Sequence, residues 1–195
     1  MKANKWMTLA AVVVLASACG GNDDGTGPGE GGANGSFSAD VTGDVETSFS
    51  GHAYHGEGED EQGNAGYGIV LSEVEAGNQN GGVLTFVRIG SSSLPAGDYP
   101  VKDPSDELQD GDVVALALDT EGNALVAMFA STGGTLHISS SSNNQIKGSF
   151  AFDAVGVVFE DPETELNVTV EGSFTAKSLP ESAVQGAART LRQVR

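Results

Sequence analysis

The chain has 195 residues, of which 38% are hydrophobic, and its 27 acidic and 9 basic side chains give a formal net charge of -18. Such a negative charge argues against nucleic acids and anionic bilayer surfaces as partners, because phosphate recognition depends on clusters of lysine and arginine. A single cysteine excludes an internal disulfide, and the length suits one folded domain with a sizeable core.

The first 18 residues predict an export signal. Lys2 and Lys5 precede an apolar run over residues 8–18, which is too short to span a bilayer as a helix but long enough for a signal-peptide core. The run ends in Ala16-Ser17-Ala18-Cys19. An ordinary secretory leader, with Cys19 as one small apolar residue, is the alternative.

This ending resembles the lipobox of bacterial lipoproteins, in which a diacylglycerol group is attached to the cysteine before the peptidase cuts in front of it. The resemblance implies that residues 1–18 are removed and that Cys19 becomes the lipidated N-terminus. The protein would then be anchored to a membrane of the bacterial cell envelope. Gly20 stands where aspartate would favour retention in the inner membrane, so the outer membrane is favoured if the cell has two.

Residues 19–35 predict a flexible tether. The stretch between Cys19 and Phe37 is GGNDDGTGPGEGGANGS, which contains no apolar residue larger than alanine. It cannot bury enough surface to offset its conformational entropy. A Gly-rich coil of about 16 residues has a root-mean-square reach of roughly 20–25 Å, enough to lift a small domain off the lipid headgroups.

Residues 36–178 predict an all-β domain, because short segments alternate between apolar and polar residues and are separated by Gly, Asn and Asp. We expect an antiparallel β-sandwich of about nine strands, with a closed β-barrel as the alternative. Two segments, Val83–Ile89 and Ala124–Phe129, are apolar on both faces, which is typical of strands covered on both sides. The expected strands are 37–41, 45–49, 65–75, 82–89, 112–119, 123–131, 134–139, 145–154 and 166–177.

Three Gly-Ser-Phe segments begin at Gly35, Gly148 and Gly172. Their unequal spacing excludes a solenoid repeat, and we expect each glycine to relieve crowding beside an inward phenylalanine. The segments GTLHISS, IKGSFAFDA and VEGSFTAK together resemble small β-rich domains of bacterial lipoproteins whose function is not established. That resemblance implies no catalytic residues.

A histidine-rich acidic run follows the second expected strand. His52, His55, Glu57 and Glu59 are of the types that bind zinc or copper. However, His52 and His55 are an odd number of residues apart, so a regular strand would point them to opposite faces. A solvated hairpin tip is the alternative interpretation. His137 is expected on the solvent-facing side of its strand.

A second acidic group lies in the Pro-bearing connection before residue 112. Its carboxylates suit the oxygen coordination of calcium, but Asp-Pro and Asp-Gly also form ordinary turns. The candidate calcium ligands are Asp103, Asp106, Asp110 and Asp112.

Residues 179–195 depart from the β pattern. Apolar residues recur at helical spacing and arginines gather near the end, which suits a short C-terminal helix and its dipole; a frayed tail is the alternative. The apolar set is Val184, Ala187, Ala188, Leu191 and Val194, and the arginines are Arg189, Arg192 and Arg195.

Catalytic motifs are scarce, because the chain has no G-x-S-x-G elbow, H-E-x-x-H helix or P-loop. We therefore expect a lipid-anchored, non-catalytic protein that has a binding or structural role at the cell envelope. Its partners would be the membrane, through the lipid on Cys19, and a surface protein or small ligand. The alternatives are a lipoprotein that handles zinc, copper or calcium, and a surface hydrolase.

Overall fold

The computed structural model describes residues 35–59, 65–73, 81–91, 93–121 and 124–178. These residues form nine β-strands and no helix, so the predicted all-β class and the number of strands are confirmed. The predicted leader, tether and C-terminal helix lie outside the described residues, except for Gly35. The strands are β1 (Ser36–Gly43), β2 (Thr47–Glu59), β3 (Ala65–Ser72), β4 (Gly81–Ile89), β5 (Gly97–Lys102), β6 (Val113–Glu121), β7 (Ala124–Ser142), β8 (Gln145–Val158) and β9 (Asp161–Ser178).

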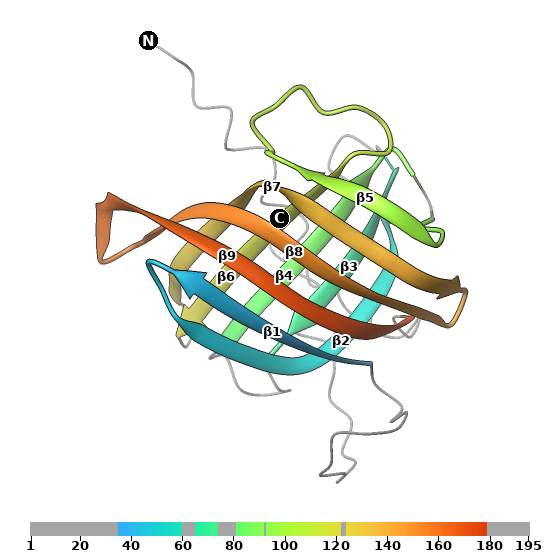
Figure 1. Cartoon of the computed structure of the whole chain (residues 1–195), viewed down its shortest axis with the longest axis horizontal. Helices are drawn as coiled ribbons and strands as arrows, with labels where there is room; N and C mark the ends of the chain where they lie inside the picture. Colours follow the sequence, from blue (N-terminus) through green and yellow to red (C-terminus); the bar gives the residue numbers. More distant parts are fainter. Residues whose placement is uncertain (1–34, 60–64, 74–80, 92, 122–123, 179–195) are drawn as a thin grey trace, which may run out of the picture.

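The nine strands form one sheet that closes on itself in the order β1-β2-β3-β4-β6-β5-β7-β8-β9 (Figure 1). The ring closes because β1 pairs with β2 on one side and with β9 on the other. Of the two predicted architectures, the structure therefore has the closed one, in which a single sheet surrounds the core. The sheet is mixed, because the short β2–β9 and β5–β6 pairings are parallel.

Three strand boundaries differ from the sequence prediction. β2 continues to Glu59, so the histidine-rich run lies within a strand and is not a hairpin tip. β5 occupies Gly97–Lys102, where a connection without a strand was expected, and Pro100 lies within it. The two strands expected over 123–139 are one strand, β7, with a register shift between Ser131 and Gly133.

The interior of the ring is filled by large side chains. Phe86, Phe150, Phe152 and Phe174 are all at most 5% exposed, and their ring centroids lie 5.1–6.4 Å apart. These separations suit the offset and edge-to-face contacts that aromatic rings prefer. The centre of the molecule is therefore a packed core.

Two of the Gly-Ser-Phe segments are interlocked across β8 and β9. Phe150 is paired with Gly172, and Gly148 is paired with Phe174. A Cβ atom built on Gly172 would lie 2.5 Å from Cζ of Phe150, and one built on Gly148 would lie 2.9 Å from Cζ of Phe174. Each glycine thus makes room for the phenylalanine ring of the other segment.

A buried serine joins three strands where β5 enters the sheet between β6 and β7. Ser131 is 1% exposed, and its hydroxyl donates to the carbonyl oxygen of Lys102 at 2.6 Å and accepts from the backbone N–H of Ala115 at 3.0 Å. Beyond this fork β6 and β7 pair directly, from Leu116 and Ala130 onward. The hydroxyl therefore satisfies backbone groups that the divergence of the strands would leave unpaired.

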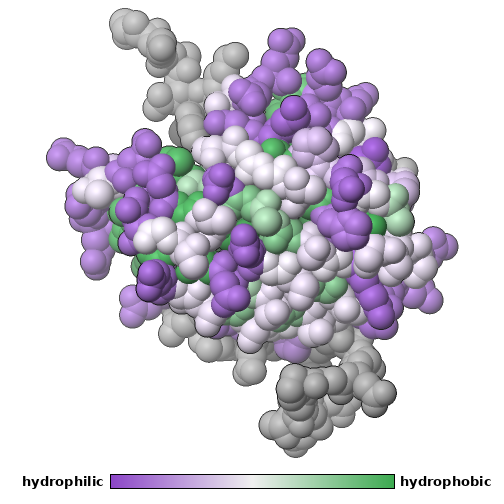
Figure 2. Space-filling model, viewed as in Figure 1, coloured by the Kyte–Doolittle hydropathy of each residue, from purple (hydrophilic) through white to green (hydrophobic). Residues whose placement is uncertain are grey.

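The outside of β1, β9 and β8 is polar. Polar residues follow one another across the strands, as in the row Ser38, Ser173, Ser149 and His137. Figure 2 shows this side of the molecule, where hydrophilic and near-neutral residues predominate. In Figure 1, β3, β4 and β6 lie behind these strands, so their outer side is on the far side of this view.

Candidate functional site

An open pocket lies on the outside of the ring, where the β1–β2 turn approaches the interior of strands β7, β8 and β9. It has a volume of about 500 Å³. Its lining residues are Gly43, Asp44, Thr132, Asp153, Ala154, Val155, Asn167, Val168 and Thr169. The polar members come from four separate segments of the chain, which the sheet register brings together.

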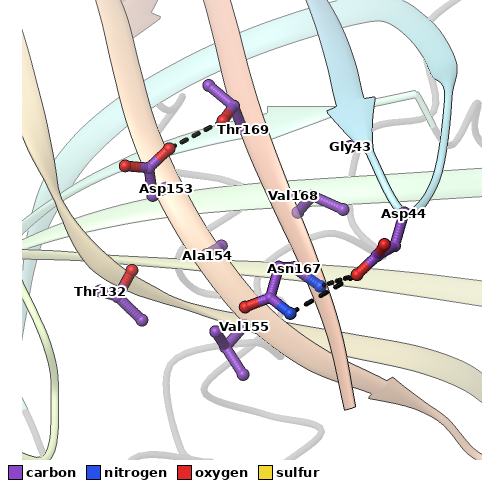
Figure 3. A pocket seen from close by; sticks show the side chains of 9 residues that line it. All are labelled: Gly43, Asp44, Thr132, Asp153, Ala154, Val155, Asn167, Val168 and Thr169. Carbon is purple, nitrogen blue, oxygen red and sulfur yellow. Dashed lines mark hydrogen bonds between the residues drawn. The ribbon is translucent and has the colours of Figure 1, made fainter. Parts of the chain in front are cut away.

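Two hydrogen-bonded pairs define the polar surface of the pocket (Figure 3). Thr169 Oγ1 donates to Asp153 Oδ1 at 2.7 Å between cross-strand partners, and the backbone N–H of Asn167 donates to Asp44 Oδ2 at 2.8 Å. The backbone N–H of Asp44 in turn donates to the carbonyl oxygen of Asn167 at 2.9 Å. These bonds hold both carboxylates in place at the rim of the pocket.

Local backbone geometry shapes this region. Gly43 has a φ of 120°, a conformation that L side chains rarely adopt, and it allows the chain to turn from β1 toward Asp44. On β7, the register shift between Ser131 and Gly133 leaves Thr132 without a cross-strand partner in the ladder. Thr132 is exposed and completes the pocket wall.

The structure separates the two histidines of the predicted transition-metal site. His55 is paired with Ile69, a core residue, and is 3% exposed, whereas His52 lies on the opposite face of β2, where its ring is 6.4 Å from that of Tyr54. Glu57 is exposed and Glu59 ends the strand. Among the described residues, no group of three or more His, Cys, Asp or Glu side chains is arranged to hold a metal ion.

His55 instead forms a buried pair with Tyr67 of β3. The Tyr67 hydroxyl lies 2.7 Å from Nδ1 of His55, and the two rings are stacked with centroids 5.9 Å apart. Burial lowers the pKa of His55, and the nearby backbone of Asn144 offsets part of that shift. Burial also raises the pKa of Tyr67, and the charge of Glu57 adds to this rise. Both groups are thus held neutral near pH 7.

The predicted calcium ligands serve the turns of the β5–β6 connection. Asp103 Oδ1 accepts from the backbone N–H of Ser105 at 2.7 Å, and Asp112 Oδ2 accepts from that of Gln109 at 2.9 Å. Asp110 lies against Gly90. These four aspartates, Asp106 included, do not converge as a ligand set in the described structure.

His137 lies on the exposed side of β7, as predicted. Its Nδ1 is 2.5 Å from Oδ1 of Asp98 on the neighbouring strand β5, and both side chains are more than half exposed. Such an exposed pair contributes little to stability, since solvent screens the interaction. It fixes a side-chain orientation on the polar outer surface.

Sequence analysis did not identify the pocket residues. Asp44 lies in the turn between β1 and β2, and Asp153 is an exposed residue of β8. No local motif could have found the site, because Asp44 and Asn167 meet only through the pairing of β1 with β9.

No protein-family model, curated protein or solved structure matches this chain. The part of the chain that the structure describes contains no helix long and apolar enough to cross a membrane.

Proposed function

We propose that this chain is a lipid-anchored protein of the bacterial cell envelope with a non-catalytic binding role, and that its ligand or partner protein meets the polar outer surface at the Asp44–Asp153 pocket. The lipid anchor is supported by the lipobox-like run Ala16-Ser17-Ala18-Cys19, which follows a basic and apolar leader. An outer membrane is the favoured location.

The position of the first strand supports this arrangement. β1 begins at Ser36, so 16 residues lie between Cys19 and the first strand. A Gly-rich coil of this length has a reach of roughly 20–25 Å. A domain on such a tether could turn its outer surface toward another envelope component.

The pocket supports binding through surface polar groups. The core is packed with phenylalanine rings, so a ligand would meet the outside of the ring. Asp44 and Asp153 are engaged by backbone and hydroxyl donors, which position carboxylates without activating a nucleophile. Carboxylate, amide and hydroxyl groups at one rim suit a cationic or hydroxyl-rich ligand.

The anchor is tested by Cys19→Ser in the full chain, expressed in a bacterial host and followed by membrane fractionation and labelling with a radioactive fatty acid. We expect loss of both the lipid label and recovery in the membrane fraction, because a serine hydroxyl does not take the thioether-linked lipid. Ala18→Gly keeps a small residue before the cysteine and serves as the control. Equal membrane recovery of Cys19→Ser and the unmodified chain would refute the anchor.

Binding at the pocket is tested with tetralysine as a cationic probe in calorimetry. Asp44→Asn with Asp153→Asn should weaken binding, whereas Glu163→Gln with Glu165→Gln removes the same charge from exposed positions of β9 outside the pocket. Equal weakening in both variants would mean that the probe responds only to net charge. Zinc, copper and calcium titrations of the same proteins test the metal-handling alternative.

A further inference from the structure

A second outer surface lies on the side of the ring formed by β3, β4, β6 and the first half of β7. Cross-strand partners lie on the same face of a sheet, so the register groups the outward side chains. Within the described strands this surface carries no charged residue, and we call it the apolar outer face. Its members are Val70, Val83, Thr85, Val87, Leu116, Leu118, Met128 and Ala130.

Key residues of the apolar outer face are buried although they point away from the core. Val83, Leu118 and Ala130 are 7%, 9% and 5% exposed, and none of them belongs to the core cluster inside the ring. A valine on the outside of a bare sheet would keep more of its surface accessible. The nine described strands all belong to the ring, so none of them can cover this face.

The C-terminal segment starts at the edge of this face. β9 ends at Ser178, which is paired with His55 of β2. The adjacent residue of β2, Tyr54, is paired with Val70 of β3, and Val70 is paired with Thr85 of β4. The chain therefore leaves β9 beside a row of residues that continues into the apolar outer face. The chain has 17 residues after Ser178. As a helix they would extend about 25 Å, and neighbouring strands are about 4.8 Å apart, so the segment is long enough to cross β2, β3, β4 and β6.

The chemistry of this segment complements the face. Its apolar residues recur at helical spacing and are small or medium in size, which suits packing on a sheet of valine, leucine and alanine. Between residues 35 and 178 there are 23 acidic and 4 basic side chains, whereas residues 179–195 contain three arginines and one glutamate. Opposite net charges favour the association.

Other segments fit less well. Residues 20–34 contain no apolar side chain larger than alanine, and residues 1–18 are expected to be removed as a leader. We propose that residues 179–195 pack as an amphipathic helix on the apolar outer face, with Val184, Leu191 and Val194 toward the sheet and Arg189 and Arg192 toward solvent and neighbouring acids. This inference is independent of the proposed ligand pocket.

The test uses the full chain with Cys19→Ser, so that Val83→Cys supplies its only thiol, and measures the rate of thiol labelling under native conditions. Val184→Asp with Leu191→Asp should accelerate labelling at least about tenfold, because the face opens locally when its cover is lost. Ser182→Asp with Gln193→Asp adds the same charge on the opposite side of the helix and should leave the rate within about twofold. Ser173→Cys on the polar outer surface should be labelled rapidly in every variant and, with the thermal transition, verifies folding.

A second measurement avoids disruptive substitutions. Val83→Cys combined with Leu191→Cys should form a disulfide within one chain under mild oxidation, and Val83→Cys combined with Gln193→Cys should not. Unchanged labelling in the Val184→Asp, Leu191→Asp variant would overturn the proposal. So would labelling that accelerates only when residues 2–18 are deleted, which would assign the face to the leader, or only on dilution, which would assign it to a second copy of the chain.

Discussion

At the scale of single residues, the core depends on glycines that give space to aromatic rings. Gly148 and Gly172 are not at turns; they lie in mid-strand, each opposite a phenylalanine of the adjacent strand. Glycine normally weakens a strand, because it adds backbone entropy and has no side chain to pack. Here the phenylalanine ring of the adjacent strand occupies the volume that a side chain would fill. This packing explains why the Gly-Ser-Phe pattern occurs on both strands.

Gly172→Ala should lower the free energy of unfolding by about 1–3 kcal/mol, because its Cβ would collide with the ring of Phe150 and with the backbone oxygen of Ser38. Urea unfolding measures the change. Gly58→Ala is the matched control, because a Cβ there has no neighbour within 4 Å. Equal effects at both positions would show that chain entropy, and not the ring, determines the role of Gly172.

His55 should make stability depend on pH. Its pKa is lowered from 6.5 in the folded state by burial, so the unfolded chain binds the proton more readily. The contribution of the neutral histidine is therefore fully present above pH 6.5 and is lost as the pH falls through the lowered value. The neighbouring titratable groups are Tyr67 on β3 and Glu57 on the same strand.

The measurement compares urea unfolding of the native chain, His55→Gln and His52→Gln at several pH values between 7.5 and 5. We expect the loss of stability toward acid to be shallower in His55→Gln than in the native chain, and unchanged in His52→Gln, whose side chain faces the outside. The same pH slope in all three proteins would exclude His55 as the titrating group.

At the scale of the strands, the divergence of β6 and β7 at Ser131 depends on one buried hydroxyl that bonds backbone groups of β5 and β6. Ser131→Ala would leave the buried backbone N–H of Ala115 without its acceptor, so we expect a loss of about 1–3 kcal/mol. Hydrogen exchange of the Ala115 amide should accelerate more than that of other β6 amides. Ser149→Ala, at an exposed position of β8, should change neither quantity. Equal exchange at Ala115 in both variants would contradict the role of this hydroxyl.

Alternation alone predicted most strands, and the long polar and apolar faces of β8 and β9 were already evident from residues 145–154 and 166–177. β5 escaped prediction because Asp98 and Pro100 are typical turn residues, and their strand forms through pairing with β7 on one side and β6 on the other. β2 was predicted too short because its glycines interrupt the alternation. Local composition does not contain the cross-strand pairing that stabilises such segments.

The candidate pocket was beyond prediction for the same reason. Asp153 and Thr169 are sixteen residues apart in sequence, and Asp44 meets Asn167 across 123 positions. Sequence periodicity assigns each of these side chains to a face of its own strand. It does not state which strands are neighbours, and the pocket depends on that order.

At the scale of the whole molecule, the negative charge should oppose folding through self-repulsion. Raising the salt concentration from about 10 to 150 mM shortens the Debye length from roughly 30 to 8 Å. We expect the melting temperature to rise by roughly 3–5 °C, which corresponds to about 1 kcal/mol for a domain of this size. Calorimetry of Glu163→Gln with Glu165→Gln should show a smaller rise. A melting temperature that falls with salt would mean that attractive ion pairs dominate.

The closure of the ring by β1 and β9 has a consequence for how the protein is made. Ser36 pairs with Thr175, so one edge of β1, the first strand to be synthesised, stays unpaired until β9, the last strand, has been made. Pairings so distant in sequence form slowly. If the chain crosses a membrane with its N-terminus first, the ring cannot close until Thr175 has also crossed. The chain would therefore stay open enough to be translocated, and the ring would close only on the far side of the membrane.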